Sequence, residues 1–303
     1  MITGILAGFA AAAAQSISYI LSRIYIGKFQ SAVLLLSVSH VIMGIFSALL
    51  FPFLKMGNGC SLNGCVMPFA GCTLFYVFGQ MAFFMALKKT DASRVSPLLG
   101  LKILFLAIFF SVFMKQGFSY LQWLAVLMCM FAALLLNWSG GRIPWRGLGW
   151  ILLACICYSL SDLNIKIMID RLDNGHDSML ARSIFSVCAC YMACGVMGLV
   201  ALCFIPRPRW EMWKAALPFS MAWLAGAFFL FTSFGFIGPV FGNIVQSSRG
   251  LISIVLGVLI ALAGFPEIEK RISRGVFTRR VFAAILMLAS IALFSAADYI
   301  TRH

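Results

Sequence analysis

The stretch Asn137–Arg146, NWSGGRIPWR, is the most polar break in an otherwise apolar chain, and it lies close to the middle. Five apolar runs precede it and five follow it, each bounded by Gly, Pro or charged residues. About 20 apolar residues span the hydrocarbon core of a bilayer as one helix. The pattern therefore predicts a first five-helix unit at residues 1–138, a linker at 139–146 and a second five-helix unit at 147–303.

Composition supports the same reading. Of the 303 residues, 62% are hydrophobic and 11% are charged, whereas an average soluble domain has about 25% charged residues. A water-soluble fold is excluded, and the fold class expected is an all-α membrane protein without room for a separate catalytic domain. The ten transmembrane helices are predicted at residues 3–22, 31–54, 66–87, 95–114, 119–138, 147–169, 178–205, 215–237, 240–263 and 277–298.

The two halves share a weak internal similarity. Ser16-Ile17-Ser18 in the first helix resembles Ser159-Leu160-Ser161 in the sixth, and Lys102 in the fourth corresponds to Arg249 in the ninth. Because each half has an odd number of helices, a duplicated half must lie upside down relative to its partner. The prediction is two inverted five-helix repeats with a central cavity between them.

The net charge of +14 is interpreted as a membrane-topology signal, with no nucleic-acid partner expected. Lys and Arg gather in the odd-numbered loops, and the positive-inside rule then places those loops in the cytoplasm and both termini outside. The first apolar run has no preceding Lys or Arg, so we expect a retained helix instead of a cleaved signal peptide. The expected location is the cell inner (plasma) membrane, as a multi-pass protein.

Ten cysteines are present, and most lie in apolar runs, where Cys acts as a small hydrophobe. Cys60 and Cys65 share a polar loop, with a spacing that permits a disulfide in an oxidising compartment. A zinc site would need two further ligands, and none is nearby. We expect no metal and no cofactor.

Several segments resemble the EamA-like branch of the drug/metabolite transporter superfamily. In the first half these are residues 86–93 (ALKKTDAS), 96–101 (SPLLGL) and 121–124 (LQWL); in the second half, 147–166 and 243–250 (NIVQSSRG). The resemblance implies a ten-helix secondary transporter built from two inverted five-helix repeats. The family often has Glu near the start and the end of the fourth helix, where this chain has Lys102 and then Lys115-Gln116.

Lys102 and Arg249 are the leading candidates for substrate binding. A Lys or Arg at the centre of a spanning helix costs about 2.5–3.5 kcal/mol on insertion scales, so such a residue is a functional candidate. If both face the central cavity they would attract a carboxylate or phosphate, and the Arg fork could hold it in bidentate fashion. Two alternatives stay open: Lys102 snorkels to the interface, or Arg249 pairs permanently with Asp162 or with helix-end carbonyls and only locks two helices together.

Asp162 lies in the most polar predicted helix and also has two interpretations. It can neutralise Lys166, which is one helical turn away, or it can titrate during transport as a proton-coupling residue. The remaining candidates for substrate binding either line the cavity or bond to neighbouring helices; they are Gln15, Tyr19, Tyr158, Asn243 and Gln246. His40 has no partner motif and is given no role.

The function predicted is a secondary transporter that moves a small anionic or zwitterionic metabolite, such as an amino acid or an organic acid, by alternating access. We expect a monomer or weak dimer in the lipid bilayer and no enzymatic activity. A membrane-embedded enzyme is one alternative, but it would need clustered titratable groups; the only cluster, His176 among three aspartates, has the pattern of a solvated loop. A channel-like facilitator is the other, and no filter segment is visible.

Overall fold

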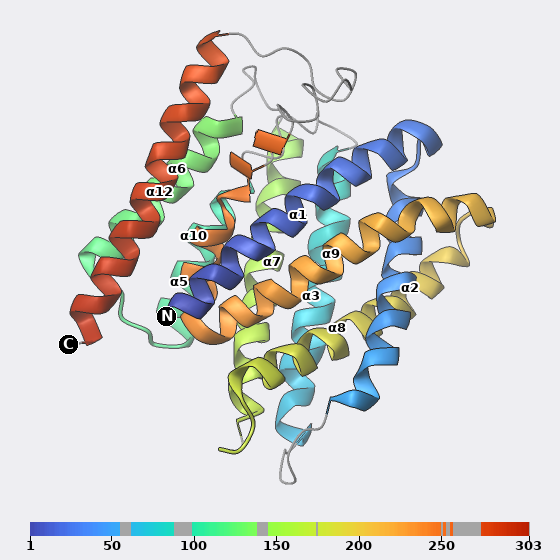
Figure 1. Cartoon of the computed structure of the whole chain (residues 1–303), viewed down its shortest axis with the longest axis horizontal. Helices are drawn as coiled ribbons and strands as arrows, with labels where there is room; N and C mark the ends of the chain where they lie inside the picture. Colours follow the sequence, from blue (N-terminus) through green and yellow to red (C-terminus); the bar gives the residue numbers. More distant parts are fainter. Residues whose placement is uncertain are drawn as a thin grey trace.

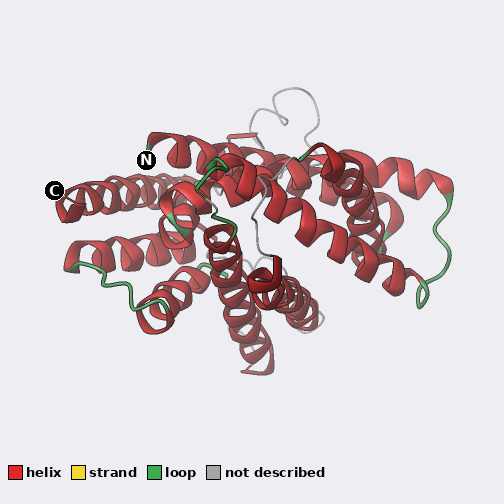
Figure 2. Cartoon of the chain, turned by 90° about the horizontal axis from the view of Figure 1, so that it is seen from below, coloured by secondary structure: helices red, strands yellow, loops and turns green. Residues whose placement is uncertain are grey.

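The computed structural model describes residues 1–54, 62–87, 99–137, 145–173, 175–249, 251–252, 255–256 and 274–302. These residues form helices joined by short connections, and they contain no strand (Figure 2). The all-α class predicted from hydropathy is confirmed. The α-helices are α1 Ile2–Phe29, α2 Ala32–Leu50, α3 Val66–Leu87, α5 Leu101–Phe113, α6 Tyr120–Asn137, α7 Trp145–Arg171, α8 Met179–Leu202, α9 Trp210–Ile237, α10 Pro239–Gln246 and α12 Arg274–Arg302.

Local chemistry explains where the first two helices end and begin. α1 continues past its predicted end until Gln30, whose left-handed backbone (φ 55°) closes the helix, as a residue in this conformation commonly does. α2 starts after Ser31, whose hydroxyl accepts the Leu34 N–H at 3.2 Å. This N-cap satisfies one of the donors that every helix start leaves unpaired.

Some predicted boundaries lie outside the described residues. These are the start of the fourth predicted helix, most of the ninth beyond α10, the middle of the predicted linker, and Cys60 with its possible disulfide. The division into units at 1–138 and 147–303 therefore stays a prediction.

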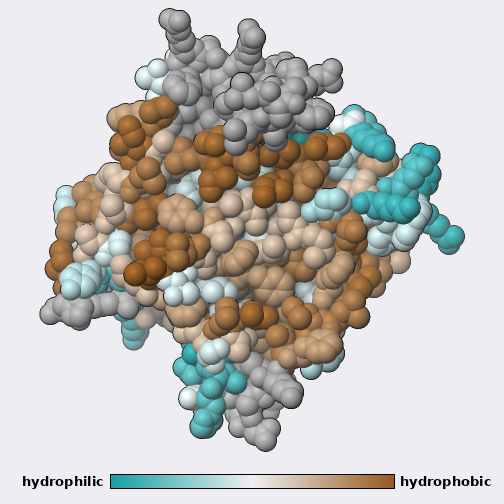
Figure 3. Space-filling view, in the orientation of Figure 1, coloured by the Kyte–Doolittle hydropathy of each residue, from teal (hydrophilic) through white to brown (hydrophobic). Residues whose placement is uncertain are grey.

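The surface and the helix lengths are those of a multi-pass membrane protein. Within the described part of the chain, seven helices are long and apolar enough to cross a bilayer, and the apolar segments Leu101–Phe113 and Tyr120–Leu135 are shorter. Figure 3 shows a broad hydrophobic face, with hydrophilic side chains gathered mainly at its extremities. Hydrophilic side chains, which lipid cannot solvate, are therefore few in the middle of this face.

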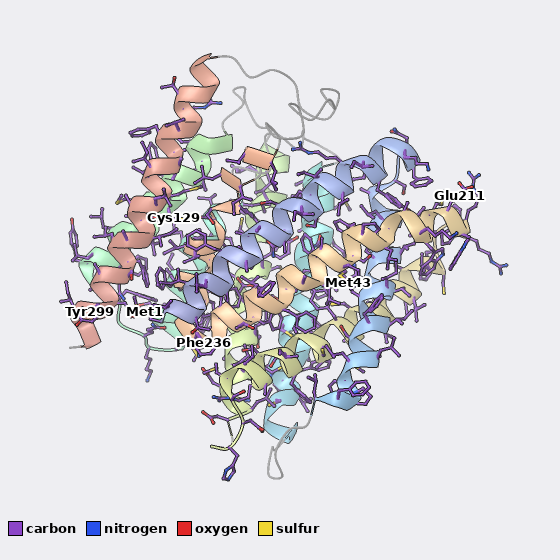
Figure 4. The ribbon with its side chains drawn as sticks, viewed as in Figure 1. Met1, Met43, Cys129, Glu211, Phe236 and Tyr299 are labelled. Carbon is purple, nitrogen blue, oxygen red and sulfur yellow. The ribbon has the colours of Figure 1, made fainter. Side chains whose placement is uncertain are left out.

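Four long helix pairs organise the packing. α1 packs along α9, α3 along α7, α2 along α8, and α6 along α12. Figure 1 shows the α6–α12 pair at one edge of the molecule, apart from the crossing helices of the centre. Met43 on α2, labelled in Figure 4, is only 1% exposed and belongs to the largely apolar core around α3, α7, α8 and α9.

α2 and α8 approach each other closely at two glycines. A Cβ built on Gly44 would lie 2.7 Å from the Cα of Gly195, and a Cβ on Gly195 would lie 2.8 Å from the Cα of Gly44. Only the absence of both side chains allows this approach, and small residues commonly have this role between membrane helices.

Candidate functional site

Two cationic residues lie inside the bundle in matching local settings. Lys102 is in the first turn of α5, and Arg249 follows α10. The hydroxyl of Ser159 on α7 donates to the Lys102 carbonyl at 3.0 Å, and the hydroxyl of Ser16 on α1 donates to the Arg249 carbonyl, also at 3.0 Å. Each hydroxyl is shared with a carbonyl of its own helix, Ala12 O at 2.7 Å for Ser16 and Cys155 O at 2.8 Å for Ser159, so each serine bridges its helix to the backbone of a cation.

The first cation is neutralised by a carboxylate. Lys102 Nζ lies 2.6 Å from Asp162 Oδ2 on α7 and 5.9 Å from the ring centroid of Tyr158. Asn243 on α10 donates its side-chain amide to the same carboxylate oxygen at 2.8 Å. Asp162 is 5% exposed, so its charge depends on these two partners instead of on water.

This geometry corrects one sequence-based interpretation. Asp162 does not pair with Lys166; Lys166 Nζ contacts Asp170 Oδ1 at 2.6 Å, in the opposite direction along α7. Both aspartates are one turn from Lys166, so local spacing allowed either pair. The interior carboxylate is therefore held by a different helix, α5.

The second cation has amide and aromatic partners. Arg249 donates from Nη1 to Gln15 Oε1 at 3.4 Å, and its guanidinium carbon lies 5.7 Å from the ring centroid of Tyr19. Gln246 donates to the same Gln15 oxygen at 2.7 Å. Within the described residues no carboxylate forms an ion pair with Arg249, so the alternative in which it pairs permanently with Asp162 is wrong.

The eight candidate residues therefore separate into two groups. One, the lysine group, contains Lys102, Tyr158, Asp162 and Asn243; the other, the arginine group, contains Arg249, Gln15, Tyr19 and Gln246. In each, the residues on α1 or α7 that flank the cation are four positions apart and thus share one helix face. The groups differ in charge, because only the lysine group contains a carboxylate.

Side chains that were given no role from the sequence lie beside the lysine group. His40 on α2 bonds through Nδ1 to the Leu36 carbonyl at 2.7 Å, so Nδ1 carries the proton and Nε2 accepts from the Tyr76 hydroxyl at 3.1 Å. The Tyr76 ring lies 6.4 Å from that of Tyr158. His40 was given no role because its partner belongs to α3, which no local motif could indicate.

A second aromatic chain leads from the arginine group. The Tyr19 ring meets Trp223 of α9 edge-on, with 6.1 Å between centroids. The Trp223 indole donates to the Tyr191 hydroxyl of α8 at 2.9 Å. Aromatic and polar side chains from α1, α2, α3, α7, α8 and α9 thus converge between the two cations.

Two apolar grooves lie elsewhere on the molecule. One, of about 550 Å³, is lined mainly by α1, α8 and α9, and the other, of about 310 Å³, lies between α2 and α9. No member of the lysine or arginine group lines either groove. Their walls are apolar, whereas binding of a charged metabolite requires polar groups.

The first half of the chain is similar to a known family. Residues 2–138 match the model of the EamA-like transporter family. No curated protein matches the chain. A solved crystal structure is similar to it with a TM-score of 0.70 and 15% sequence identity, over 99% of each chain; at this identity the likeness shows the fold alone. The apolar helices make this chain a multi-pass membrane protein, and its first half, residues 2–138, is similar to the EamA-like transporter family.

Proposed function

We propose that this chain is a secondary transporter that moves a small anionic or zwitterionic metabolite, such as an amino acid or organic acid, across the cell inner (plasma) membrane. Ten spanning helices form two inverted five-helix repeats, and the substrate site between them opens to one side at a time. The protein works as a monomer or weak dimer and needs no cofactor. The observation that carries the proposal is that Arg249, inside the bundle, contacts an amide and an aromatic ring and no carboxylate among the described residues.

The helix pairs support the inverted repeats. Under the proposed duplication α1 corresponds to α7 and α3 corresponds to α9. α1 packs along α9, and the counterparts α7 and α3 pack along each other. α2 with α8 and α6 with α12 are pairs of counterparts. Exchanging the two halves thus interchanges the first two pairs and maps each of the last two pairs onto itself, as a pseudo-twofold axis requires.

The serine bonds follow the same exchange. Ser16 of the first half holds the Arg249 carbonyl of the second, and Ser159 of the second half holds the Lys102 carbonyl of the first. The two cations are therefore equivalent positions of the proposed repeats. A site between inverted repeats near the bilayer midplane is where transporters of this architecture bind substrate.

Arg249 binds the anionic group of the substrate. An Arg charge in a membrane interior needs a counter-charge or strong hydrogen bonds. Its contacts among the described residues are the Gln15 amide, at 3.4 Å, and the Tyr19 ring. Neither of these two described partners carries a negative charge, and a carboxylate or phosphate of the substrate supplies one to the donor fork.

Asp162 couples transport to protons. Protonation of its carboxyl removes the charge that holds Lys102 and leaves the Asn243 amide beside a neutral acid. Contact between α5, α7 and α10 then weakens at one point. A charge change at a helix junction is a local event of the kind that shifts a two-state equilibrium between conformations.

Transport assays on purified protein in liposomes test the proposal. Amino acids, organic acids, phosphorylated metabolites and cationic drugs are compared at fixed membrane potential, with and without a pH gradient. Saturable uptake of an anionic or zwitterionic compound, with counterflow driven by unlabelled substrate, is the expected result. Non-saturable flux without counterflow would indicate a channel, formation of a product would indicate an enzyme, and uptake of cationic compounds alone would overturn the role of Arg249.

A further inference from the structure

Two buried cysteines from different helices lie in direct contact. The Sγ atoms of Cys72 on α3 and Cys190 on α8 are 2.8 Å apart, within about 1 Å of the ~2.05 Å bond of a disulfide. The side chains are 2% and 5% exposed, respectively, and α3 and α8 pack against each other. The two sulfur atoms can therefore reach bonding distance by a small movement of the side chains.

The surroundings orient the two thiols. Cys72 Sγ donates to the Phe69 carbonyl at 3.2 Å and lies 3.7 Å from the Thr73 hydroxyl. With the Cys72 hydrogen directed to Phe69, the Cys190 thiol is the donor in the sulfur–sulfur contact. Cys194 lies one turn further along α8 and is also buried, at 4%, which makes it a natural control.

We propose that Cys72 and Cys190 are a site of covalent modification by oxidation, at which a disulfide forms between α3 and α8. Each thiol loses its hydrogen, the Sγ–Sγ bond forms, and two electrons and two protons leave together. A membrane-soluble quinone accepts both and becomes the quinol. A quinone is the oxidant named here because it dissolves in the apolar interior of a membrane, and the two cysteines belong to a largely apolar core.

The disulfide would connect more than two helices. The Ser161 hydroxyl on α7 donates to the Cys72 carbonyl at 2.8 Å, and Ser161 precedes Asp162 in the chain. Oxidation therefore joins α8 covalently to an α3 segment that is already bonded to α7. In terms of the proposed function, on which this step rests, α3 and α8 belong to opposite repeats, so the bond stops alternating access.

Mass spectrometry of the full-length protein tests the modification independently of transport. The protein in liposomes is treated with tetramethyl-1,4-benzoquinone, whose fully substituted ring does not alkylate thiols; free thiols are then blocked with N-ethylmaleimide and the chain is digested. We expect a peptide pair linked through Cys72 and Cys190 that dithiothreitol separates. Cys72→Ala and Cys190→Ala abolish it, and Cys194→Ala retains it. Absence of the linked pair in the wild-type protein, or its loss in Cys194→Ala, overturns the proposal.

Transport by the same samples tests the consequence. Oxidation abolishes uptake by the wild-type protein and by Cys194→Ala, dithiothreitol restores it, and Cys72→Ala transports equally before and after the quinone. Linked peptides with unchanged uptake would overturn the block on alternating access while leaving the modification intact. A reduced wild-type protein without any uptake would contradict the proposed function, and the peptide result would still decide the disulfide.

Discussion

Lys102 of α5 and Asp162 of α7 form an ion pair with 2.6 Å between Nζ and Oδ2, and the Asn243 amide of α10 donates to the same carboxylate oxygen. Three helices from both halves of the chain meet at this one oxygen. Because the side chains of Lys102 and Asp162 are only 19% and 7% exposed, water can replace little of what either partner provides. The pair is consequently sensitive to any change in its charge.

Asp162→Asn keeps the shape of the side chain and removes its charge. Leaving a buried ion without its partner destabilises a protein by about 3–5 kcal/mol, so we expect a clearly lower unfolding temperature in detergent. Surviving protein should take up substrate without responding to a pH gradient. The measurements are thermal unfolding of the purified variant and uptake with and without the gradient.

Two further variants are controls for this prediction. Asp162→Asn combined with Lys102→Met removes both charges and should recover part of the lost stability. Lys166→Gln breaks the pair with Asp170, whose side chain is 43% exposed, and should change stability by no more than about 1 kcal/mol. Equal losses of stability in Asp162→Asn and Lys166→Gln would contradict the importance assigned to the ion pair of Lys102 and Asp162.

Arg249→Gln should weaken substrate binding with little loss of folded protein. Charge-assisted hydrogen bonds contribute about 1.5–3 kcal/mol, which corresponds to roughly tenfold to a hundredfold in affinity. Arg249→Lys keeps the charge but loses the forked guanidinium, so its affinity for substrate should lie between those of the wild-type protein and Arg249→Gln. Binding of the anionic substrate, measured by thermal stabilisation or calorimetry, separates these cases; Lys28→Gln, at the exposed end of α1, should bind normally.

Gly195→Ala should loosen the contact between α2 and α8. The added methyl group would meet the Gly44 backbone at 2.8 Å, and backbone cannot move aside as a flexible side chain can, so we expect a loss of about 1–3 kcal/mol. Gly27→Ala is the matched control, because nothing lies within 4 Å of its Cβ position and Ala favours a helix by up to about 1 kcal/mol. Equal stability of the two variants would contradict the packing argument.

The connection between α7 and α8 should weaken in acid. The Gly175 N–H, which donates to Asp173 Oδ1 at 3.1 Å, is the main cause of a lowered pKa of this carboxyl. Desolvation opposes the lowering, and Arg182, 2.8 Å from Oδ2, adds to it. A carboxyl with a lowered pKa stabilises the folded state above its unfolded pKa of about 3.9, and this stabilisation is lost as the pH falls through the folded value.

Asp173→Asn tests that pH dependence. Hydrogen exchange of residues 172–182 is measured between neutral pH and about pH 3, spanning the titration of Asp carboxyls. In the wild-type protein protection should fall at the acidic end. In Asp173→Asn it should already be lower at neutral pH, because the buried Arg182 (6% exposed) loses its carboxylate, and it should vary less with pH. A wild-type dependence retained in the variant would assign the effect to another group.

Hydropathy predicted the helices because apolar length is a local property of the chain. The same reasoning identified Lys102 and Arg249, since a cation within an apolar run is visible without knowing its neighbours. The partners of these cations could not be predicted in this way. Lys166 lies one turn from both Asp162 and Asp170, and only the position of α5 beside α7 decides which carboxylate it takes.

Partners that come from distant helices explain the other misses. His40 bonds to Tyr76 and Cys72 contacts Cys190, each across two helices whose relative register no local spacing encodes. Arg249 shows the same limit. Pairing with Asp162 was one alternative that its sequence position left open, but its neighbours are Gln15 and Tyr19 of α1, brought there by the packing of α1 on α10.

The glycine contact between α2 and α8 has a mechanical consequence. Gly44 and Gly195 contact each other through backbone atoms, so no side chains interdigitate at this point. Two helices in contact through backbone can tilt about that point without repacking side chains, whereas helices with interdigitated side chains cannot. If the two halves rotate against each other during transport, we expect this contact to be the pivot of the rotation.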